Sequence, residues 1–504
     1  MGLSEDIEAV LSIDPAQPAL EFLGRWSTWG ELQGAAQAIA AAIRSSGQGA
    51  GRRLGILMRN RAELVPAMLA LLTNELCLAT LNATAPDDKL AADILAVEVP
   101  LIVATEADWQ RPGIVDAAAQ AGSRGLSLCA DGTVRFISDL PGEVEKWRRP
   151  DAPGIAIEML SSGTTGTPKR IPLAYRSFER ALRDAAGYER GREAGASPRL
   201  RSGVQIVTAP LAHISGMTGV MNNLLAGRKI CLIERFTVEA FRDAVMRHRP
   251  KVAGAPPSAL RMLLDADIPK EDFASLVAYR TGTAPLDPDL ADAFYRRYGI
   301  PVLQNYGATE FAGGVAGWTI EDFHAQWTAK RGSVGRLNPG AEGRVVDPDN
   351  GEILSPGQEG LLELRAPNIG DGETWVRTTD LAVLDTDRFL WIRGRHDGAI
   401  IRGGFKILPE DVLAALEAHP AVREAAVVGI ADRRLGAVPV AAYIPKSGAT
   451  PPAEEEMRGW LKERLMPYQV PVRVLAVDEL PRTPSMKVSQ PALKALFEGL
   501  VVEA

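Results

Sequence analysis

The sequence predicts an α/β protein of at least two domains, built on parallel sheets whose faces are covered by helices. Up to Gly332, stretches with helical spacing of apolar residues alternate with strand-like stretches, which is the pattern of βαβ units. The chain has 504 residues, more than one ordinary hydrophobic core holds, so at least two domains are expected. After Gly332, short strand-like pieces separated by Gly, Pro, Asp and Asn turns fill residues 333–393 and predict a small β-rich subdomain.

The individual elements follow from capping residues, apolar spacing and helix breakers. Thr28 and Glu31 have the spacing of a capping box, which starts a helix. The glycines of segment 47–51 follow that helix and precede a strand, the reverse of the order in a dinucleotide-binding loop, so this segment is a turn. In chain order we expect a helix over 32–43, a strand over 53–58, a helix over 63–72 and a strand over 76–81, and beyond residue 397 a helix over 409–417 and strands over 425–430 and 438–443.

Composition and charge limit the class of partner and the location. The net charge is −7, the pI is near 5.6 and no basic run is present, so nucleic acid is not expected as a partner. The three cysteines are scattered, which predicts reduced, buried thiols. The N-terminus is acidic and unlike a signal peptide, and no apolar run approaches the length of a membrane span. We therefore expect a cytoplasmic protein without an integral membrane segment.

The segment 161–169, Ser-Ser-Gly-Thr-Thr-Gly-Thr-Pro-Lys, is the most informative stretch of the chain. Residues 155–160 before it read as a buried strand, so the loop leaves the end of a strand, where nucleotides bind in α/β sheets. Backbone N–H groups, hydroxyls and Lys169 can surround a polyphosphate. The loop is not a Walker A motif, because two residues separate Gly166 from Lys169. On these residues alone, a phosphate loop and a polar surface turn both remain open.

Segment 161–169 resembles the phosphate loop of the adenylate-forming superfamily, which includes acyl-CoA synthetases, peptide-synthetase adenylation domains and firefly luciferase. Further segments match that family in the same order along nearly the whole chain. They are 210–216, 282–286, 305–310, 378–380, 394–397, 402–406 and 481–487. One such match carries little weight, whereas this many in order are not expected by accident.

The resemblance implies a more detailed fold than the pattern alone. It implies a large N-terminal domain of doubly wound sheets with the small β-rich subdomain, followed by a smaller, mobile α+β lid. The N-terminal adenylate-forming domain, which binds ATP and the acid, would span residues 1–395 and the lid residues 396–504. Their junction would lie within 394–397, with Asp397 as the hinge.

The resemblance also assigns the nucleotide contacts. Thr309 would bond a phosphate and Glu310 would hold Mg²⁺, a metal that prefers carboxylate and phosphate oxygens. Asp380 would accept hydrogen bonds from the ribose hydroxyls, with Arg395 as a second ribose contact. On their own, Glu310 reads as a solvated acid and Asp380 as a turn residue. The phosphate loop would contribute Ser161, Ser162, Gly163, Thr164, Thr165, Gly166 and Lys169, and the adenine slot Gly282, Thr283, Ala284, Pro285, Asn305, Tyr306, Gly307 and Ala308.

Two further residues join Thr309 and Glu310 as implied catalytic residues. Lys487 would enter the site from the lid and neutralise the carboxylate and the α-phosphate during adenylation. His213 matches the family's position at the wall of the acyl pocket, although a core histidine with satisfied hydrogen bonds also remains open.

The segment 402–406 is expected to serve the second reaction step. Gly403 and Gly404 resemble the part of the family that lines the pantetheine tunnel. Arg402 stands where some relatives have lysine, which leaves its role open. No two of the five histidines have metal-ligand spacing, so no zinc site is expected.

Together these residues imply an acyl-CoA synthetase, which activates a fatty or aryl carboxylic acid with ATP and Mg²⁺ and then passes the acyl group to coenzyme A. Three alternatives stay open. One is a stand-alone acyl- or amino-acid-adenylating enzyme that delivers to a carrier protein, although segment 210–219 has no acid to hold an ammonium group. The second is a luciferase-like oxidase, which the motifs do not exclude. The third is a non-catalytic relative that acts as a binding module. A homodimer is also left open.

Overall fold

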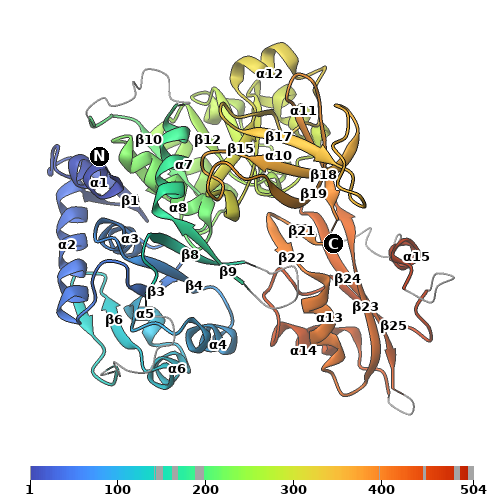
Figure 1. Cartoon of the computed structure of the whole chain (residues 1–504), viewed down its shortest axis with the longest axis horizontal. Helices are drawn as coiled ribbons and strands as arrows, with labels where there is room; N and C mark the ends of the chain where they lie inside the picture. The colour runs from blue at the N-terminus through green and yellow to red at the C-terminus, as the bar shows by residue number, and fades with distance from the viewer. Residues whose placement is uncertain are drawn as a thin grey trace.

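The computed structural model of the chain describes residues 2–140, 142, 151–161, 169–187, 198–396, 398–446, 450–481 and 488–497. A large N-terminal body holds several sheets, and a smaller C-terminal domain, residues 398–497, lies beside it (Figure 1). Among the described residues, no helix is both long and apolar enough to cross a lipid bilayer.

The largest sheet of the body has seven strands, β3 (Arg53–Met58), β4 (Cys77–Asn82), β5 (Leu101–Thr105), β6 (Arg124–Leu128), β7 (Val134–Phe136), β8 (Ile155–Ser161) and β9 (Lys169–Ala174). Their order is β7-β6-β5-β3-β4-β8-β9, and the five inner strands are parallel while both edge strands run antiparallel. This arrangement confirms the parallel sheet that the alternating pattern predicted.

Helices cover both faces of this sheet. Leu101 and Val103 of β5 face one core with α1 (Leu3–Leu11), α2 (Trp29–Ser45) and α3 (Leu64–Thr73). Ile102 and Ala104 face a second core with α4 (Asp87–Val97) and α6 (Ile114–Ala121), and the short α5 (Glu106–Trp109) lies on that side too. The predicted helices and strands over 32–81 all lie within α2, β3, α3 and β4 to within a few residues.

The capping box predicted at the start of α2 is present. The hydroxyl of Thr28 accepts the N–H of Glu31 at 3.1 Å, and the carboxylate of Glu31 accepts the N–H of Thr28 at 2.7 Å. Two donors at the helix start are thereby satisfied, which fixes where α2 begins.

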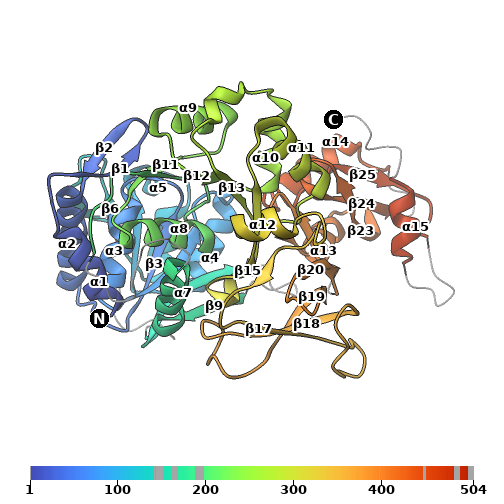
Figure 2. The same cartoon turned by 90° about the horizontal axis from the view of Figure 1, so that it is seen from above.

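Two further sheets complete the parallel part of the body. The first has the strand order β10 (Val204–Val207), β11 (Lys229–Leu232), β1 (Pro18–Phe22) and β2 (Arg25–Thr28). The second has the strand order β12 (Val252–Gly254), β13 (Ala278–Thr281), β14 (Val302–Ala308), β15 (Gly313–Gly317) and β16 (Arg336–Leu337). Around them lie α7 (Tyr175–Gly187), α8 (Ile214–Leu225), α9 (Val238–His248), α10 (Pro257–Asp265), α11 (Pro288–Tyr298), α12 (Ile320–Gln326) and the 3₁₀ helices η1 (Lys270–Phe273) and η2 (Thr309–Phe311). Seen from above, α9, α10 and α11 lie together along one side of the body (Figure 2).

The β-rich subdomain predicted over 333–393 is an antiparallel sheet of four consecutive strands, β17 (Glu342–Val346), β18 (Glu359–Arg365), β19 (Val376–Leu384) and β20 (Leu390–Arg395). Leu362, Leu364, Ala382 and Leu390 are fully buried at its core. Its last strand ends two residues before the predicted hinge.

The C-terminal domain has one sheet in the order β22-β21-β24-β23, with β25 beside β24. The strands and helices are β21 (Ile400–Arg402), β22 (Phe405–Ile407), β23 (Val422–Asp432), β24 (Gly436–Pro445), β25 (Arg473–Ala476), α13 (Pro409–Glu417), α14 (Glu454–Lys462) and α15 (Gln490–Ala495). The predicted helix over 409–417 is α13, and the predicted strands lie within β23 and β24. These two strands form an antiparallel hairpin, because the three residues between them are too few for a crossover.

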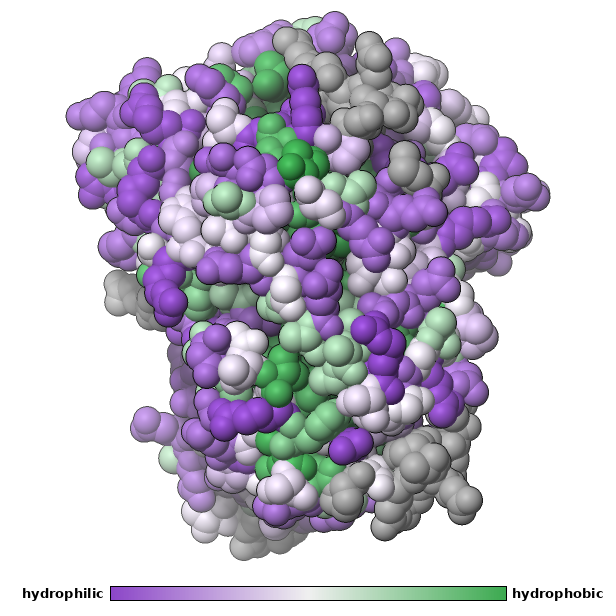
Figure 3. Space-filling model, turned by 90° about the vertical axis from the view of Figure 1, so that its left-hand side faces the viewer, coloured by the Kyte–Doolittle hydropathy of each residue, from purple (hydrophilic) through white to green (hydrophobic). Residues whose placement is uncertain are grey.

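The face of the body on the left of Figure 1 is shown in Figure 3. Apolar side chains gather in a band down the middle of that face, and polar side chains occupy much of the surface on either side. Bands of this kind occur where proteins contact partners, and the homodimer stays a prediction.

Candidate active site

β8 and β9 hold the two ends of the candidate phosphate loop. Ser161, the last residue of β8, pairs with Lys169, the first residue of β9. Because the two strands are antiparallel, the loop closes a β-hairpin instead of leading from a strand into a helix. The remaining candidates, Ser162, Gly163, Thr164, Thr165 and Gly166, lie outside the described residues, so phosphate binding by this loop stays a prediction.

The two segments predicted to form the adenine slot, 282–285 and 305–308, lie side by side. The two segments are adjacent because they directly follow Thr281 of β13 and Gln304 of β14, which are in register in a parallel pair of strands. A Cβ at Gly282 would lie only 2.3 Å from Oδ1 of Asn305, so any larger residue would require the Asn305 side chain to move. A Cβ at Gly307 would lie 2.2 Å from the carbonyl oxygen of Gly313 on the next strand.

Thr283 adopts an unusual backbone conformation inside this slot. Its φ is 68°, in the left-handed region that β-branched residues rarely enter. Its side chain is exposed on the side that the C-terminal domain approaches, as described below. Ala284, Pro285 and Ala308 lie in the same two segments, so the sequence-predicted slot is assembled as a unit.

Asp380 lies at the centre of a polar group contributed by three strands. Asp380 of β19 is in register with Arg395 of β20, and Nη1 of Arg395 donates to Oδ1 of Asp380 at 2.9 Å. The hydroxyl of Tyr306 on β14 donates to Oδ2 of Asp380 at 2.5 Å. Nη2 of Arg395 also contacts the hydroxyl of Thr379. We call Tyr306, Asp380 and Arg395 the polar wall.

The contacts of the polar wall do not use every lone pair of the Asp380 carboxylate. Asp380 is buried, and each of its oxygens carries two lone pairs, so both can accept one further hydrogen bond. Burial and the charge of Asp380 raise the pKa of Tyr306 well above its ordinary value, which keeps the phenol protonated as a donor. Arg395 and Tyr306 thus fix the orientation of the Asp380 carboxylate, and its role as a ribose acceptor stays a prediction.

Thr309 and Glu310 directly follow β14 and begin η2. The carboxylate of Glu310 is exposed, and its charge is close enough to contribute to the raised pKa of Tyr306. Among the described residues it joins no cluster of three metal-ligating side chains. An accessible carboxylate beside a hydroxyl is an all-oxygen donor set that suits Mg²⁺, whose other ligands would be phosphate oxygens and water.

His213 precedes α8 and packs against the C-terminal domain. Its ring meets that of Phe405 edge to face, with centroids 5.3 Å apart and planes at 65°. Phe405 in turn stacks on Tyr468 with centroids 4.5 Å apart. Burial lowers the pKa of His213, so its imidazole is neutral at pH 7.

Gly404 brings the hairpin β21–β22 onto the adenine slot. Its φ is 93°, and a Cβ there would lie 2.7 Å from Oγ1 of Thr283. A Cβ at Gly403 would lie 3.9 Å from Oγ of Ser258, on α10 of the body. We call the contact of Gly404 and Phe405 with Thr283 and His213 the packed wall. It places the candidate tunnel residues against the candidate nucleotide residues.

Arg402 stabilises the hairpin from within the C-terminal domain. Its Nη1 donates to the carbonyl oxygens of Tyr468 at 2.9 Å and Val470 at 3.0 Å. Arg402, whose role the sequence left open, therefore has a structural role, because it joins the hairpin to the segment that carries Tyr468.

Two further predicted residues are not placed. Lys487 and the hinge Asp397 lie outside the described residues. The neighbour of the hinge, His396, donates its N–H to the carbonyl of Thr379 at 2.8 Å, so the chain is held against β19 up to that point. The functions of Lys487 and Asp397 stay predictions.

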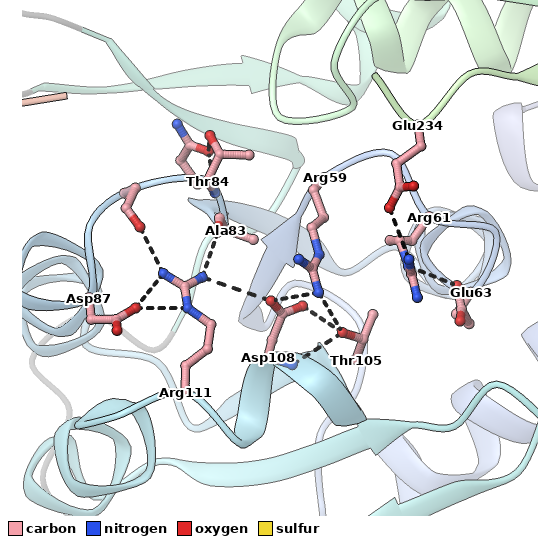
Figure 4. Close-up of polar contacts among 12 residues, drawn as sticks. Arg59, Arg61, Glu63, Ala83, Thr84, Asp87, Thr105, Asp108, Arg111 and Glu234 are labelled. Carbon is pink, nitrogen blue, oxygen red and sulfur yellow. Dashed lines mark hydrogen bonds and ion pairs between the residues drawn. The ribbon is translucent and has the colours of Figure 1, made fainter. Parts of the chain in front are cut away.

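A buried charge cluster fixes the loops at the carboxyl ends of β3, β4 and β5 (Figure 4). Asp108 is fully buried, lies 3.1 Å from Arg59 and 3.8 Å from Arg111, and accepts the hydroxyl of Thr105 at 2.6 Å. Arg111 also binds Asp87 and two carbonyl oxygens of the loop after β4. The start of α4 is therefore held firmly by side chains that sequence patterns did not single out.

α4 also contacts the C-terminal domain. Lys89 of α4 and Asp411 of α13 attract each other, which opposes the effect of burial on the pKa of each. Met466 packs against the core that α4 and α6 share with the sheet. The C-terminal domain thus meets the body at α4 as well as at the packed wall.

The sequence missed Tyr468, and it assigned Tyr306 to adenine without its bond to Asp380. Phe405 was expected only as part of the tunnel segment 402–406, and its contact with His213 was not. The register between β19 and β20, which sets Asp380 opposite Arg395, had no counterpart in the sequence pattern.

Comparison with known proteins agrees with this geometry. A family model described as AMP-binding enzyme matches residues 8–372, and one described as AMP-binding enzyme C-terminal domain matches residues 412–487. 4-Coumarate–CoA ligase-like 2 of Arabidopsis thaliana is 30% identical over 72% of this chain and 65% of its own length. 4-Coumarate–CoA ligase 3 of Oryza sativa subsp. japonica is 28% identical over 95% of this chain and 89% of its own. The structure of the amide bond synthetase McbA from Marinactinospora thermotolerans has a TM-score of 0.84 and 27% identity over 99% of this chain and 100% of that one.

Proposed function

We propose that this chain, which belongs to the family of AMP-binding enzymes, is an AMP-forming acid–thiol ligase. It would activate a fatty or aryl carboxylic acid with ATP and transfer the acyl group to coenzyme A. The observation that carries this proposal is the meeting of the polar wall and the packed wall. One offers a buried carboxylate that would accept the ribose hydroxyls, and the other brings the glycine hairpin of the C-terminal domain to the predicted adenine slot.

In the first step, a carboxylate oxygen attacks the α-phosphorus of ATP while the bond to pyrophosphate breaks. Asp380 would hold the ribose, and segments 282–285 and 305–308 would hold the adenine. Mg²⁺, held by Glu310, would neutralise phosphate charge when bound. Lys487 would place a further positive charge between the two anions. These fixed charges align two anionic reactants that repel each other in water.

In the second step, the sulfur of coenzyme A attacks the acyl carbonyl, its thiol proton is lost to solvent and AMP leaves. Gly403 and Gly404 would line the path of the pantetheine arm, because glycine lets the arm pass close to the backbone. His213, neutral and half-buried under Phe405, would close the acyl side of the site without adding charge. The described arrangement of the two domains suits this step, since the hairpin already contacts the slot.

The acid is proposed to be apolar-tailed or aromatic. Segment 210–219 carries no Asp or Glu to pair with a substrate ammonium, and an unpaired buried ammonium costs several kcal/mol. Met217 and Met221 of α8, the helix that follows His213, are buried and apolar. The two plant relatives are named for an aryl acid, which puts hydroxycinnamic acids among the first to try.

An amine is the second candidate acceptor. The similarity to the amide bond synthetase McbA favours it, because an amine can attack the same acyl adenylate. The two proposals share the adenylation step and differ only in the nucleophile of the second step. Carrier-protein delivery and a non-catalytic binding role remain weaker alternatives.

One assay panel tests the proposal. Purified protein is incubated with ATP, Mg²⁺ and an acid from fatty, aryl and amino-acid sets, and pyrophosphate release is followed with coenzyme A, with simple amines and with neither. We expect release with an aryl or fatty acid and a thioester product only with coenzyme A. Amide formation in place of the thioester would favour the second candidate, and no release with any acid would contradict the ligase proposal.

The location and the oligomeric state are also proposals. A cytoplasmic location and a homodimer are checked by microscopy of a tagged chain and by light scattering of the purified protein. Omitting Mg²⁺ from the assay, and restoring it, tests the proposed metal dependence.

A further inference from the structure

The outer side of α2 carries no charge along most of its length. The helix forms the left-hand edge of the body in Figure 1 and therefore lies on the face that Figure 3 shows. Its sequence from residue 32 to residue 43 contains no Asp, Glu, Lys or Arg, although residues of this stretch are exposed. A surface helix ordinarily presents charged side chains to water, as α9 does with Glu239, Asp243 and Arg247.

Charged side chains occur only at the two ends of this exposed side. Glu31 lies in the first turn of α2 and Arg44 in the last turn, and both are exposed. The carboxylate of Glu31 caps the helix at Thr28, and Nη1 of Arg44 donates to Oδ1 of Asn74 at 2.9 Å. Among the described residues neither joins an ion pair, so both charges are available to a partner. We call the exposed residues Glu31, Gly34, Gln37, Ala38, Ala41 and Arg44 the α2 face.

We propose that the α2 face packs antiparallel against the α2 face of a second copy of this chain, about a twofold axis near Ala38. A twofold interface uses the same patch on both copies, so the patch must complement itself. Glu31 and Arg44 lie equally far from the midpoint between Gln37 and Ala38. An antiparallel pair therefore sets Glu31 of each copy beside Arg44 of the other, whereas a parallel pair would set like charges together.

Gly34 gives a second reason to expect a close neighbour. A Cβ at Gly34 would meet no atom within 4 Å, so packing inside the chain does not require glycine there. Glycine destabilises a helix interior relative to alanine. At Gly30, by contrast, a Cβ would lie 2.9 Å from Cβ of Pro15, which explains that glycine within one copy. A second helix that crosses close to the backbone of α2 would supply the missing reason at Gly34.

Apolar side chains beside α2 enlarge the α2 face. A stable interface covers about 800 Å² on each partner, more than one face of a short helix offers. Ser12 accepts Nε2 of Gln33 at 3.1 Å, which brings its neighbour Ile13, 40% exposed, next to α2. Val134 and Phe136 of β7 are half-buried and also lie beside α2. The covered area would therefore include segment 12–13 and β7.

The chemistry of the α2 face favours a second copy over a lipid surface. Helices that bind membranes combine large apolar side chains with several Lys and Arg residues. The α2 face has alanine and glycine where such helices have large side chains, and it carries one charge of each sign. Those two charges are satisfied together only by a partner with the same spacing in reverse order, which a second copy provides.

Sedimentation of the tag-free, full-length protein is the first measurement. From low to tens of micromolar we expect a species of twice the chain mass of 54.0 kDa. Ala38→Glu should weaken dimerisation on the order of 100-fold or more, because two like charges would meet at the axis. Ala119→Glu is the matched control, since Ala119 is an exposed alanine of the helix α6, and it should leave the dimer unchanged. Melting temperatures show whether each variant is folded.

Cross-linking tests the direction of the two helices. Ala38→Cys should form a disulfide between copies under a mild oxidant, and the native cysteines do not interfere because all three are buried. Glu31→Cys should not, because the two residues 31 of an antiparallel pair lie about 20 Å apart at a rise of ~1.5 Å per residue. A disulfide needs Cα atoms within about 7 Å of each other.

The outcomes separate this interface from the homodimer in general. A monomer at every concentration would overturn both. A dimer that Ala38→Glu leaves intact, or that Glu31→Cys cross-links as fast as Ala38→Cys, would overturn the antiparallel α2 contact alone. None of these measurements depends on the proposed ligase activity.

Discussion

The two walls of the candidate site are built by different physical means. The polar wall joins three strands of the body through charged hydrogen bonds, with Asp380 bound by Arg395 at 2.9 Å and by Tyr306 at 2.5 Å. The packed wall joins the C-terminal domain to the body through shape, with a glycine backbone against Thr283 and a phenyl ring against His213.

The difference indicates how one site can serve two reactions. Charge-assisted hydrogen bonds are specific in geometry and costly to leave unmade, so they suit a binding surface that stays in place. Contacts between rings and backbone can be released to solvent and remade without leaving an unpaired charge. We infer that the polar wall holds the nucleotide in both steps and that the packed wall forms for the second step only.

The largest predicted effect is at Lys487, which would face the reacting phosphate in the first step, when the contacts of the packed wall are not formed. Lys487→Ala should lose adenylation by about 10²–10³-fold, because it removes one preorganised charge at the reacting phosphate. The variant should still convert chemically supplied acyl adenylate and coenzyme A to the thioester. Rates of the two half-reactions on one preparation provide the measurement, with Lys494→Ala, an exposed lysine of α15, as control. A normal adenylation rate in Lys487→Ala would mean that Lys487 does not enter the site, and would contradict an exchange of the packed wall for contacts of Lys487 between the two steps.

The polar wall is tested at Asp380. Asp380→Asn keeps the shape but removes the charge that binds Arg395 and the ribose. Its loss should raise the KM for ATP about 10- to 100-fold, since hydrogen bonds to a charged group contribute ~1.5–3 kcal/mol. Both half-reactions should suffer, unlike in Lys487→Ala.

Asp385→Asn is the control, because Asp385 also binds a cation, Lys330, at 2.7 Å in the same subdomain. It should leave the KM for ATP unchanged. Melting temperatures of both variants separate a binding defect from unfolding. An unchanged KM in a folded Asp380→Asn would reduce Asp380 to a structural partner of Arg395.

The packed wall is tested at Gly404. Gly404→Ala adds a Cβ that would lie 2.7 Å from Oγ1 of Thr283, so this arrangement of the domains should become less favourable. We expect thioester formation to fall about tenfold, which corresponds to ~1.4 kcal/mol, with adenylation little changed.

Gly436→Ala supplies the matched control for backbone strain. Gly436, the first residue of β24, has a φ of 82°, and an added Cβ there meets only ordinary contacts. It shares the left-handed conformation with Gly404 but not the close approach to Thr283. Equal loss of both half-reactions in Gly404→Ala, or the same loss in Gly436→Ala, would speak against a wall that serves one step.

The smallest effect concerns pH and His213. Burial lowers its pKa in the folded chain below the value of about 6.5 expected when unfolded. The unfolded chain then binds the proton more readily, so stability should fall as the pH drops below that unfolded value. In His213→Gln, stability should decrease less as the pH drops. Melting temperatures between pH 5 and 7.5 check it, and parallel curves for the two proteins would show that His213 does not contribute.

The fold was largely predictable because it follows from local patterns. Alternating apolar spacing gave β3, α3 and β4, and the turn-rich composition after Gly332 gave the antiparallel subdomain. The pairing of β23 with β24, and of β8 with β9, depends on connection length and on long-range contacts, which single-segment patterns do not contain.

Motifs named the candidate residues, whose roles stay predictions, but not how the described ones come together. They named Asp380, Arg395 and Gly404, whereas the bond from Tyr306 and the stacking of Phe405 depend on register and packing between distant segments.

Arg395 is both a contact of Asp380 and the residue two positions before the predicted hinge. Because Asp380 and Thr379 hold its guanidinium, and His396 is bonded to Thr379, any turning of the C-terminal domain must begin after residue 396. Reorientation would then be confined to a few backbone torsions after residue 396. If Asp380 binds the ribose as proposed, this pivot lies beside the nucleotide, and the loss of AMP would remove one of its neighbours.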